Sequence, residues 1–336
     1  MGLTVAVTGP TGDIGKPLLR ALEQSEGVDR VIGMARRPFD PSSEGWQKTA
    51  YRQGDVLERA DVEALVDGAD VVVHLAFIIV GDSEETHRVN LDGSRNVFEA
   101  AIGAGVERLV YTSSVAAYGF HDQNPQPLTE EIAPIGTEGF YYSAQKAELE
   151  DLLTRALAGA STDAYVFRPC IVAGPEATTL IEQLVRMVEL GGALGPVRRT
   201  LEALPFLRPV IPGPGVPFQL VHHDDVAAAL LAAIEGRGTP GVYNLAGEGE
   251  LTVANLAAAL DWYSVPVPAL AVRLASEAVD RVPFLSAELE WIHTVRVPAL
   301  MDNTKARAEL GWDPVFDAEE TLRETVAAAR DEQLIP

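Results

Sequence analysis

The chain has few of the features that mark several large classes of protein. Only one of its 336 residues is a cysteine, Cys170, so no internal disulfide can form and a reducing compartment is indicated. No stretch reaches the roughly 18 uninterrupted apolar residues of a membrane helix. The first residues lead directly into an apolar run, without the basic stretch and cleavage site of a secretory signal. We therefore predict a cytoplasmic protein that binds no membrane.

Positive charge is scarce as well. The chain has 26 Lys and Arg against 49 Asp and Glu, which gives a formal net charge of −23. Binding to nucleic acid requires basic patches, so no nucleic acid partner is predicted. Apolar side chains, in contrast, are plentiful at 47%. This composition is typical of a globular protein with a sizeable core.

Apolar and amphipathic runs alternate through the first half of the chain. Strand-like runs cover 3–8, 30–35, 51–56, 70–76, 108–114 and 163–169, and helix-like runs cover 16–24, 61–67, 86–105 and 141–159. Strands that are apolar throughout are typical of a parallel sheet covered on both faces. The order predicts an α/β fold with a doubly wound parallel sheet of the Rossmann type.

Three glycines, Gly9, Gly12 and Gly15, join the first strand to the first helix in TGPTGDIGKP. A loop for nucleoside triphosphates needs glycine at position 10 and a hydroxyl at position 17, and both positions are proline. The spacing suits a dinucleotide, because glycine lets the backbone approach a diphosphate at the N–H groups of the helix N-terminus. A turn without a ligand is the alternative.

Beyond Pro169 the alternation loosens. A helical run at 178–192 and a segment rich in Pro and Gly at 204–218 precede 219–235 and 241–247, where the sheet is expected to resume. We predict three parts. They are a dinucleotide-binding domain of 1–174 plus 219–250, a smaller and mostly helical substrate lobe of 175–218 plus 251–302, and C-terminal helices within 303–336.

Tyr142 precedes Lys146 by four residues in a helical run, so the two side chains share one face, which Tyr141 does not. A phenol with a pKa near 10 is a poor acid–base group at neutral pH. A nearby ammonium lowers that pKa by stabilising the phenolate, and a proton can then move to or from a carbonyl oxygen. Ser113 and Ser114 end a strand at the same sheet edge. A surface Tyr–Lys pair and ordinary turn serines are the alternatives.

In their order, these motifs resemble the extended short-chain dehydrogenase/reductase superfamily, in its NAD(P)-dependent epimerase/dehydratase-like group. The resemblance covers about the first 250 residues and rests on TGPTGDIG, GDV, HLA, RVNLDGSRNV, TSSVAAYG, YSAQK, FRPCIVAGP, HHDDVA and GVYNLAGEG, followed later by DNTKARAELGW. It implies that Tyr142 is the acid/base and that Lys146 modulates its pKa and binds ribose. It also implies that Ser114 orients the substrate oxygen and that Asn90 supports a water-linked proton path.

The resemblance also implies which residues bind the dinucleotide. They are Gly9, Thr11, Gly12, Asp13, Ile14, Gly15, Asp55, Val56, Leu75, Ala76, Tyr142, Lys146 and Pro169. The choice of cofactor is made at the end of the second strand, where NAD-selective sites carry Asp or Glu. Here GMARRP carries Arg36 and Arg37, whose guanidinium groups suit a 2′-phosphate, so NADP(H) is predicted over NAD(H). Two solvated arginines are the alternative.

No metal site is predicted at HHDD, residues 222–225. Adjacent side chains of a strand point to opposite faces, so consecutive residues seldom converge on one ion. The resemblance makes Asp224 or Asp225 the cap of the following helix. Cys170, in an apolar strand, is expected to be a buried structural thiol.

Departures from the family pattern reduce the number of reactions that this chain is expected to catalyse. Sugar-nucleotide 4,6-dehydratases carry an Asp-Glu pair where this chain has Val115 and Ala116, so dehydration is excluded. Epimerases usually carry an arginine where this chain has Gln219. The nearby insert is apolar at Phe206, Leu207, Val210, Ile211 and Phe218.

We therefore predict an NADP(H)-dependent oxidoreductase that interconverts a carbonyl and a secondary alcohol on a largely apolar small molecule. The second candidate is a sugar-nucleotide epimerase that uses Arg198, Arg199 or Arg208 to bind an anionic group. The third is a noncatalytic dinucleotide-binding sensor or scaffold. The resemblance also implies a homodimer formed through the helices at 86–103 and 141–158.

Overall fold

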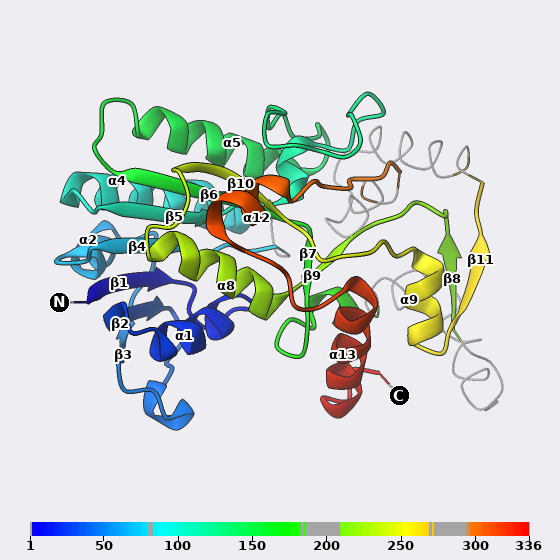
Figure 1. Cartoon of the computed structure of the whole chain (residues 1–336), viewed down its shortest axis with the longest axis horizontal. Coiled ribbons are helices and arrows are strands. Elements are labelled where there is room, and N and C mark those ends of the chain that lie inside the picture. The colour runs from blue at the N-terminus through cyan, green and yellow to red at the C-terminus, as the bar shows by residue number, and fades with distance from the viewer. Residues whose placement is uncertain are drawn as a thin grey trace.

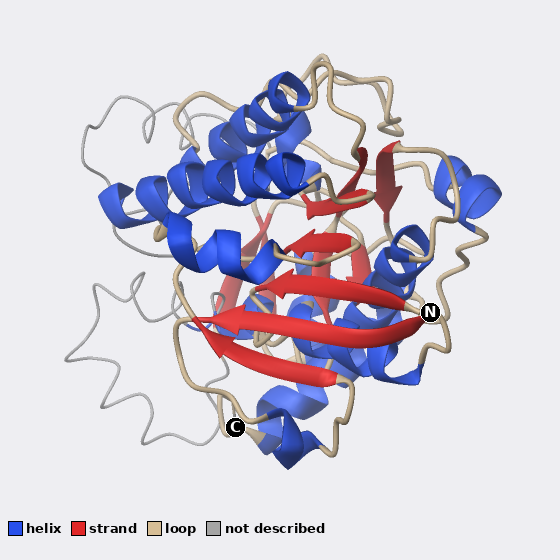
Figure 2. Ribbon diagram, turned by 90° about the vertical axis from the view of Figure 1, so that its left-hand side faces the viewer, coloured by secondary structure: helices blue, strands red, loops and turns tan. Residues whose placement is uncertain are grey.

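A parallel sheet forms the centre of the molecule. The structure, a computed structural model, describes residues 2–79, 83–182, 185, 209–268, 271, 294 and 296–335. Within these ranges a seven-stranded sheet has the order β10-β6-β5-β4-β1-β2-β3, and its arrowheads lie along one edge (Figure 2). The strands are β1 (Leu3–Thr8), β2 (Val28–Ala35), β3 (Thr49–Gln53), β4 (Val71–His74), β5 (Arg108–Thr112), β6 (Asp163–Pro169) and β10 (Gly241–Leu245).

Helices cover both faces of this sheet, which confirms the doubly wound prediction (Figure 1). One face carries α1 (Gly15–Gln24), α8 (His223–Ile234) and α12 (Thr304–Leu310), and the other carries α2 (Arg59–Val66), α4 (Ser94–Ala104) and α5 (Tyr141–Ala156). Leu18 and Leu22 of α1 are buried in the first core cluster, whereas Val62 of α2 and Leu149 of α5 are buried in the second. The sheet therefore separates two apolar cores.

The helical run expected at 86–105 is divided. It consists of α3 (Ser83–His87), a π-helical turn η2 (Arg88–Gly93) and α4. Such turns insert a residue into a helix and are frequent at functional sites. Two short 3₁₀ turns, η1 (Pro41–Glu44) and η3 (Val115–Tyr118), follow β2 and β5.

The prediction that a strand within 219–235 belongs to the main sheet is wrong. β9 (Leu220–His222) pairs in parallel with β7 (Ile171–Ala173) in a separate two-stranded sheet. The place beside β6 in the main sheet is occupied by β10, the other segment named in that prediction. Because β7 follows β6 after a single residue, β9 pairs with this extension beyond the main sheet.

The remaining described elements lie to one side of the main sheet (Figure 1). β8 (Val210–Gly213) pairs in parallel with β11 (Tyr263–Pro266), and α9 (Val253–Ala259) and α13 (Ala318–Asp331) are nearby. Leu251 and Leu256 pack with Leu322 of α13 in a third apolar cluster. Residues 186–208 and 272–293 lie outside the described ranges, so the mostly helical lobe and the division into three parts stay predictions. Within the described residues, no helix has both the length and the apolar character to cross a membrane.

Candidate active site

The glycine loop lies against the end of β4 at the carboxyl edge of the sheet. Gly9 has a φ of +71°, and a Cβ added there would lie 2.8 Å from the backbone nitrogen of Ala76. A Cβ at Gly15 would lie 2.2 Å from the carbonyl oxygen of Gly9. Both glycines are therefore required by contacts within the protein.

Gly12 is different. The nearest atom to an added Cβ there would be 3.6 Å away, an ordinary contact distance, and the residue is exposed. Helix α1 begins at Gly15 without a side-chain cap and without an acidic residue in its first turn. Its N-terminal N–H groups therefore have no side-chain acceptor, and the bare backbone at Gly12 leaves room for an anion in front of them. Thr11 is exposed, and Asp13 and Ile14 are half-buried around this point. This arrangement fits a diphosphate.

Other predicted cofactor residues reach the same edge from neighbouring strands. Arg36 and Arg37 follow β2, Asp55 and Val56 lie just beyond β3, and Leu75 and Ala76 follow β4. Leu75 donates its backbone N–H to Thr8 at 3.2 Å, which fixes this loop beside the glycines. Pro169 ends β6, on the far side of β5. The parallel sheet thus brings these predicted residues to one edge.

Two of these residues have unexpected partners. The carboxylate of Asp13 accepts a 2.5 Å hydrogen bond from Thr179, and burial raises the pKa of Asp13. The guanidinium of Arg36 lies 3.6 Å from the carboxylate of Glu85 in α3, and both side chains are more than half exposed. An exposed ion pair contributes only about 0–1 kcal/mol, so Arg36 can exchange this partner for another anion at little cost.

Tyr142 and Lys146 share one face of α5 as predicted, and Ser114 joins them from the end of β5. The hydroxyl of Ser114 lies close enough to the phenol of Tyr142 to act on its pKa, which it lowers. Ser114 also accepts the N–H of Ala116 at 3.1 Å, which fixes its rotamer at the start of η3. Lys146 is buried and donates to the carbonyl of Thr112 at 2.9 Å.

The expected lowering of the pKa of Tyr142 by Lys146 is not found. Burial raises the pKa of Tyr142, and only the nearby hydroxyl of Ser114 acts in the other direction. Burial also lowers the pKa of Lys146 to about 7, while the charge of Glu150 acts to raise it. The ammonium lies 6.0 Å from the ring centroid of Tyr142 and 3.8 Å from that of Phe77. Helical spacing predicted the shared face but could not predict the desolvation of both groups.

An apolar wall surrounds the phenol of Tyr142. Ala116, Phe120 and Phe140 are buried there, and Val297 and Ala299 pack against them together with Tyr142. The ring of Phe77 meets that of Tyr142 edge to face at 5.5 Å. The wall combines residues far apart in the sequence, and we did not predict Phe77.

Asn90 is fully buried in the π-helical turn. Its amide oxygen accepts the N–H of Ile78 at 2.8 Å, and its amide nitrogen donates to the carbonyl of Ile78 at 2.9 Å and to Gln145 at 2.8 Å. The side chain therefore holds the segment after β4 against α5. Its role in a water-linked proton path stays a prediction.

Other buried polar residues behind Tyr142 were missed by the sequence reasoning. Glu150 of α5 binds Arg168 of β6 through two hydrogen bonds and accepts a third from Ser113. One signal was present, because Glu150 follows Lys146 by four residues on the same helical face. Cys170 is buried as expected, and burial raises the pKa of its thiol.

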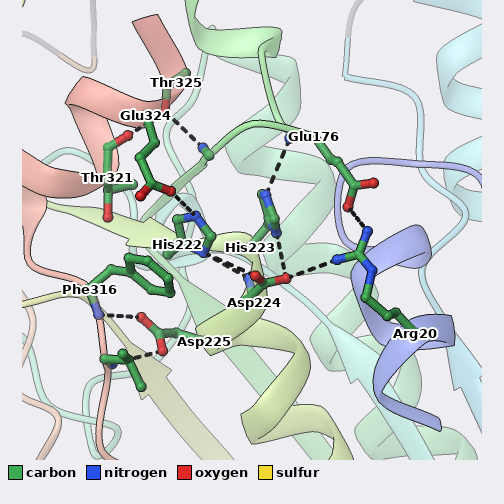
Figure 3. A network of polar contacts seen from close by, with 12 residues as sticks. Arg20, Glu176, His222, His223, Asp224, Asp225, Phe316, Thr321, Glu324 and Thr325 are labelled. Atoms are coloured by element: carbon green, nitrogen blue, oxygen red, sulfur yellow. Dashed lines mark hydrogen bonds and ion pairs between the residues drawn. The ribbon is translucent and has the colours of Figure 1, made fainter. Parts of the chain in front are cut away.

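Three of the side chains at 222–225 converge, although consecutive residues of a strand seldom do so. The ligand-type atoms of His222, His223 and Asp224 all lie within 4.8 Å of one another. They converge because β9 ends at His222 and α8 begins at His223, so the chain turns between them (Figure 3). Existing contacts already involve both histidines. His223 contacts Asp224 at 3.0 Å and accepts the N–H of Glu176 at 3.2 Å, and His222 lies 3.3 Å from Glu324.

The predicted helix cap was also wrong. His222 caps α8 by accepting the N–H of Asp224 at 3.2 Å. The carboxylate of Asp225 instead accepts the N–H groups of Val315 and Phe316 (Figure 3). A histidine nitrogen can replace the usual oxygen acceptor at this position because Nδ1 is unprotonated in one neutral tautomer.

The residues weighed for the substrate fall into two groups. Arg198, Arg199, Arg208, Phe206 and Leu207 lie outside the described residues. Val210 is 55% exposed on β8, Ile211 is buried, and Phe218 packs in the third apolar cluster. Gln219 accepts the N–H of Met301 at 2.8 Å, so its amide oxygen serves a backbone contact.

Comparison with known proteins gives a consistent family match. The model of the NAD dependent epimerase/dehydratase family matches residues 5–246. An uncharacterized protein of Mycobacterium tuberculosis is 28% identical over 332 residues, which cover 98% of this chain but only 30% of that protein. A UDP-glucose 4-epimerase of Vibrio cholerae is 25% identical over 98% of this chain and 96% of its own length. Human 3 beta-hydroxysteroid dehydrogenase type 7 is 36% identical over 125 residues, 35% of this chain and 34% of that protein.

Solved structures share the fold. A short-chain dehydrogenase/reductase superfamily protein of Agrobacterium tumefaciens with bound NAD has a TM-score of 0.73, with 19% identity over 98% of both chains. The UDP-glucose 4-epimerase of Thermotoga maritima with UDP-glucose has a TM-score of 0.71, with 22% identity over 98% of this chain and all of that one.

Proposed function

Since the chain belongs to the NAD dependent epimerase/dehydratase family and is an enzyme of the extended short-chain dehydrogenase/reductase type, we propose that it is an NADP(H)-dependent oxidoreductase. It interconverts a carbonyl and a secondary alcohol on a largely apolar small molecule. The observation that carries this proposal is the phenol of Tyr142, which lies beside the hydroxyl of Ser114 and packs against an apolar wall.

In the reductive direction Tyr142 donates its proton to the carbonyl oxygen of the substrate. Ser114 holds the same oxygen through its hydroxyl, and Lys146, in its protonated form, stabilises the phenolate that remains. A bound reduced dinucleotide supplies the hydride to the carbonyl carbon. Because Ala116, Phe120 and Phe140 exclude water around the phenol, the charge that develops there is weakly screened and the position of Lys146 matters more.

The apolar wall also bears on the substrate. Buried aromatic rings beside the acid/base favour a substrate with apolar surface, since a sugar would leave its hydroxyl groups without partners there. A sugar-nucleotide epimerase is the second candidate, and similarity to the Vibrio epimerase along its whole length favours it. An epimerase returns its hydride to the substrate, so it produces no net change in NADPH absorbance.

The experiment compares two neighbouring tyrosines. Tyr142→Phe should lower kcat for NADPH-linked ketone reduction by about 10²–10⁴-fold, the usual effect of losing a general acid. Tyr141→Phe is the matched control, because its hydroxyl already donates to the backbone carbonyl of Ile79. Undiminished turnover in Tyr142→Phe would refute the assignment. Failure of the wild type to oxidise NADPH with any ketone, together with turnover of a UDP-sugar, would favour the epimerase.

The preference for NADP(H) rests on Arg36 and Arg37 after β2. Replacing both by alanine should weaken NADP⁺ binding at least tenfold, about 1.4 kcal/mol, and leave NAD⁺ binding nearly unchanged. Glu85→Gln is the matched control and should strengthen NADP⁺ binding, because a carboxylate beside Arg36 repels the 2′-phosphate. Tighter binding of NAD⁺ than of NADP⁺ by the wild type would contradict the preference.

The oligomeric state is part of the same proposal. We propose that a homodimer forms through α4 and α5, which pack side by side on one face of the sheet (Figure 1). Light scattering should give twice the mass of one chain, and a monomeric mass would refute it. A noncatalytic sensor would bind dinucleotide without turning over any substrate, so the Tyr142 experiment also tests this third candidate.

A further inference from the structure

Three residues on α5 share one face. Tyr142, Lys146 and Glu150 are spaced four residues apart, so they lie on successive turns of the helix. Glu150 is 5% exposed. A carboxylate is seldom buried to this extent unless several groups compensate its charge. The proposed reaction does not itself use this carboxylate.

Three hydrogen bonds compensate the charge of Glu150. Arg168 donates from Nε at 2.9 Å to one oxygen and from a terminal nitrogen at 2.5 Å to the other. Ser113 donates its hydroxyl to the first oxygen at 2.6 Å. The guanidinium of Arg168 also lies 4.3 Å from the ring centroid of Tyr118. Glu150 is therefore held in one orientation by two neighbouring strands.

Ser113 connects this network to the active site. The residue before it, Thr112, supplies the carbonyl that accepts from Lys146, and the residue after it, Ser114, lies beside the phenol of Tyr142. A single carboxylate on α5 thus holds the strand end that carries both contacts. Glu150 also follows Lys146 by about one turn of the helix.

We propose that Glu150 is a positioning residue, which sets the register between α5 and the end of β5 and keeps a negative charge behind Lys146. This proposal rests on the proposed function. It predicts that replacing Glu150 by a neutral side chain lowers the pH at which Lys146 loses its proton.

The other titratable groups near Lys146 supply no negative charge near pH 7. His74 of β4 is neutral near pH 7, because burial and the charge of Lys146 lower its pKa to about 3. Tyr111 of β5 lies 5.3 Å from the ammonium, and burial raises the pKa of this tyrosine well above its usual value. On α5 itself, burial raises the pKa of Tyr142 as well. Among these neighbours Glu150 is the remaining anion, and its counter-ion is Arg168 of β6.

The test removes the charge without leaving its partner unpaired. Glu150→Gln alone leaves a buried arginine without an anion and can fail to fold, so the double variant Glu150→Gln/Arg168→Gln is made beside it. Reduction needs the ammonium, so kcat/KM falls as pH rises through the pKa of Lys146. This fall of kcat/KM is the alkaline limb of the pH profile, and in the double variant it should occur about one pH unit lower. At pH values above the limb, kcat/KM of the double variant should therefore be about tenfold lower than that of the wild type.

Glu148→Gln is the matched control, the same chemical change at an exposed position of α5. It should leave the limb in place. An unchanged limb in the double variant would overturn the proposal, since a merely structural ion pair would lower activity equally at every pH.

A second measurement separates this proposal from the proposed function. The pH dependence of unfolding, compared with and without Lys146→Met in each background, follows the protonation of Lys146 without any substrate. If no ketone is reduced but the double variant still moves this dependence to lower pH, the role of Glu150 stands and the reaction is wrong. If neither the limb nor the unfolding profile moves, the role of Glu150 is refuted.

Discussion

Replacing Lys146 by methionine isolates the energetic cost of burying its ammonium. The side chain is 3% exposed, and burial lowers its pKa from the usual 10.5 to about 7. Below pH 7 the amine is protonated in both the folded and the unfolded chain. The folded state then carries the full cost of the buried charge, about 5 kcal/mol, since one pKa unit corresponds to about 1.4 kcal/mol.

The sign of the pH dependence follows from proton counting. Between pH 7 and 10.5 the unfolded chain keeps the proton of Lys146 while the folded chain has lost it. The unfolded state thus binds more protons, and the free energy of unfolding rises with pH. Methionine is similar in length and does not titrate. The difference in free energy of unfolding, wild type minus Lys146→Met, should be level below pH 7 and should rise by about 1.4 kcal/mol per pH unit above it.

Urea unfolding followed by tryptophan fluorescence, from pH 5.5 to 9.5 and without dinucleotide, measures this difference. Loss of the hydrogen bond to Thr112 and of the contact with Phe77 changes the offset between the two proteins but not the slope. Lys16→Met, at a partly exposed position of α1, is the control for the same change of side chain outside the buried site. A level difference for Lys146→Met above pH 7 would refute the claim that burial governs the charge of Lys146.

Three further predictions concern the sheet edge. Burial and the charge of Lys146 lower the pKa of His74 from 6.5 to about 3, so the wild type should lose stability as the pH falls through this range. Between pH 7 and pH 4.5 the free energy of unfolding of the wild type should fall by about 3 kcal/mol relative to that of His74→Gln, as measured by urea unfolding. Gly15→Ala should lower the melting temperature because its Cβ meets the Gly9 carbonyl, whereas Gly12→Ala should melt normally and lose dinucleotide affinity in a fluorescence titration. Asp13→Asn should bind the dinucleotide severalfold more tightly, most visibly at low salt, because a carboxylate beside a diphosphate repels it; equal affinities would contradict this.

Local patterns predicted most of the elements and failed where the chain changes direction. The apolar runs at 3–8 and 163–169 coincide with β1 and β6, because a strand buried on both faces must be apolar throughout. The strand at 220–222 was placed in the wrong sheet, since no local pattern records which neighbour a strand pairs with. At 222–225 the alternation of side chains along a strand does not hold, because a strand ends and a helix begins there, and His222, His223 and Asp224 converge.

In the candidate site, too, local spacing predicted some features and distant side chains determined the others. Spacing alone placed Tyr142 and Lys146 on one face of a helix, because four residues make about one turn. It could not predict that burial raises one pKa and lowers the other, since desolvation depends on which distant side chains pack around the pair. Phe77, Phe120 and Phe140 come from separate parts of the chain, and only the fold brings them to the phenol.

By itself, the order of residues determined the glycine turn and the helical face of the acid/base pair, because these depend on interactions between near neighbours along the chain. It also indicated a parallel sheet, through strands whose apolar character shows that both of their faces are covered. Tertiary structure alone decided how Glu150 meets Arg168 and Ser113, which strand pairs with β7, and how far Lys146 is removed from water. These properties depend on contacts between segments far apart in the sequence, which form only when the whole sheet is assembled.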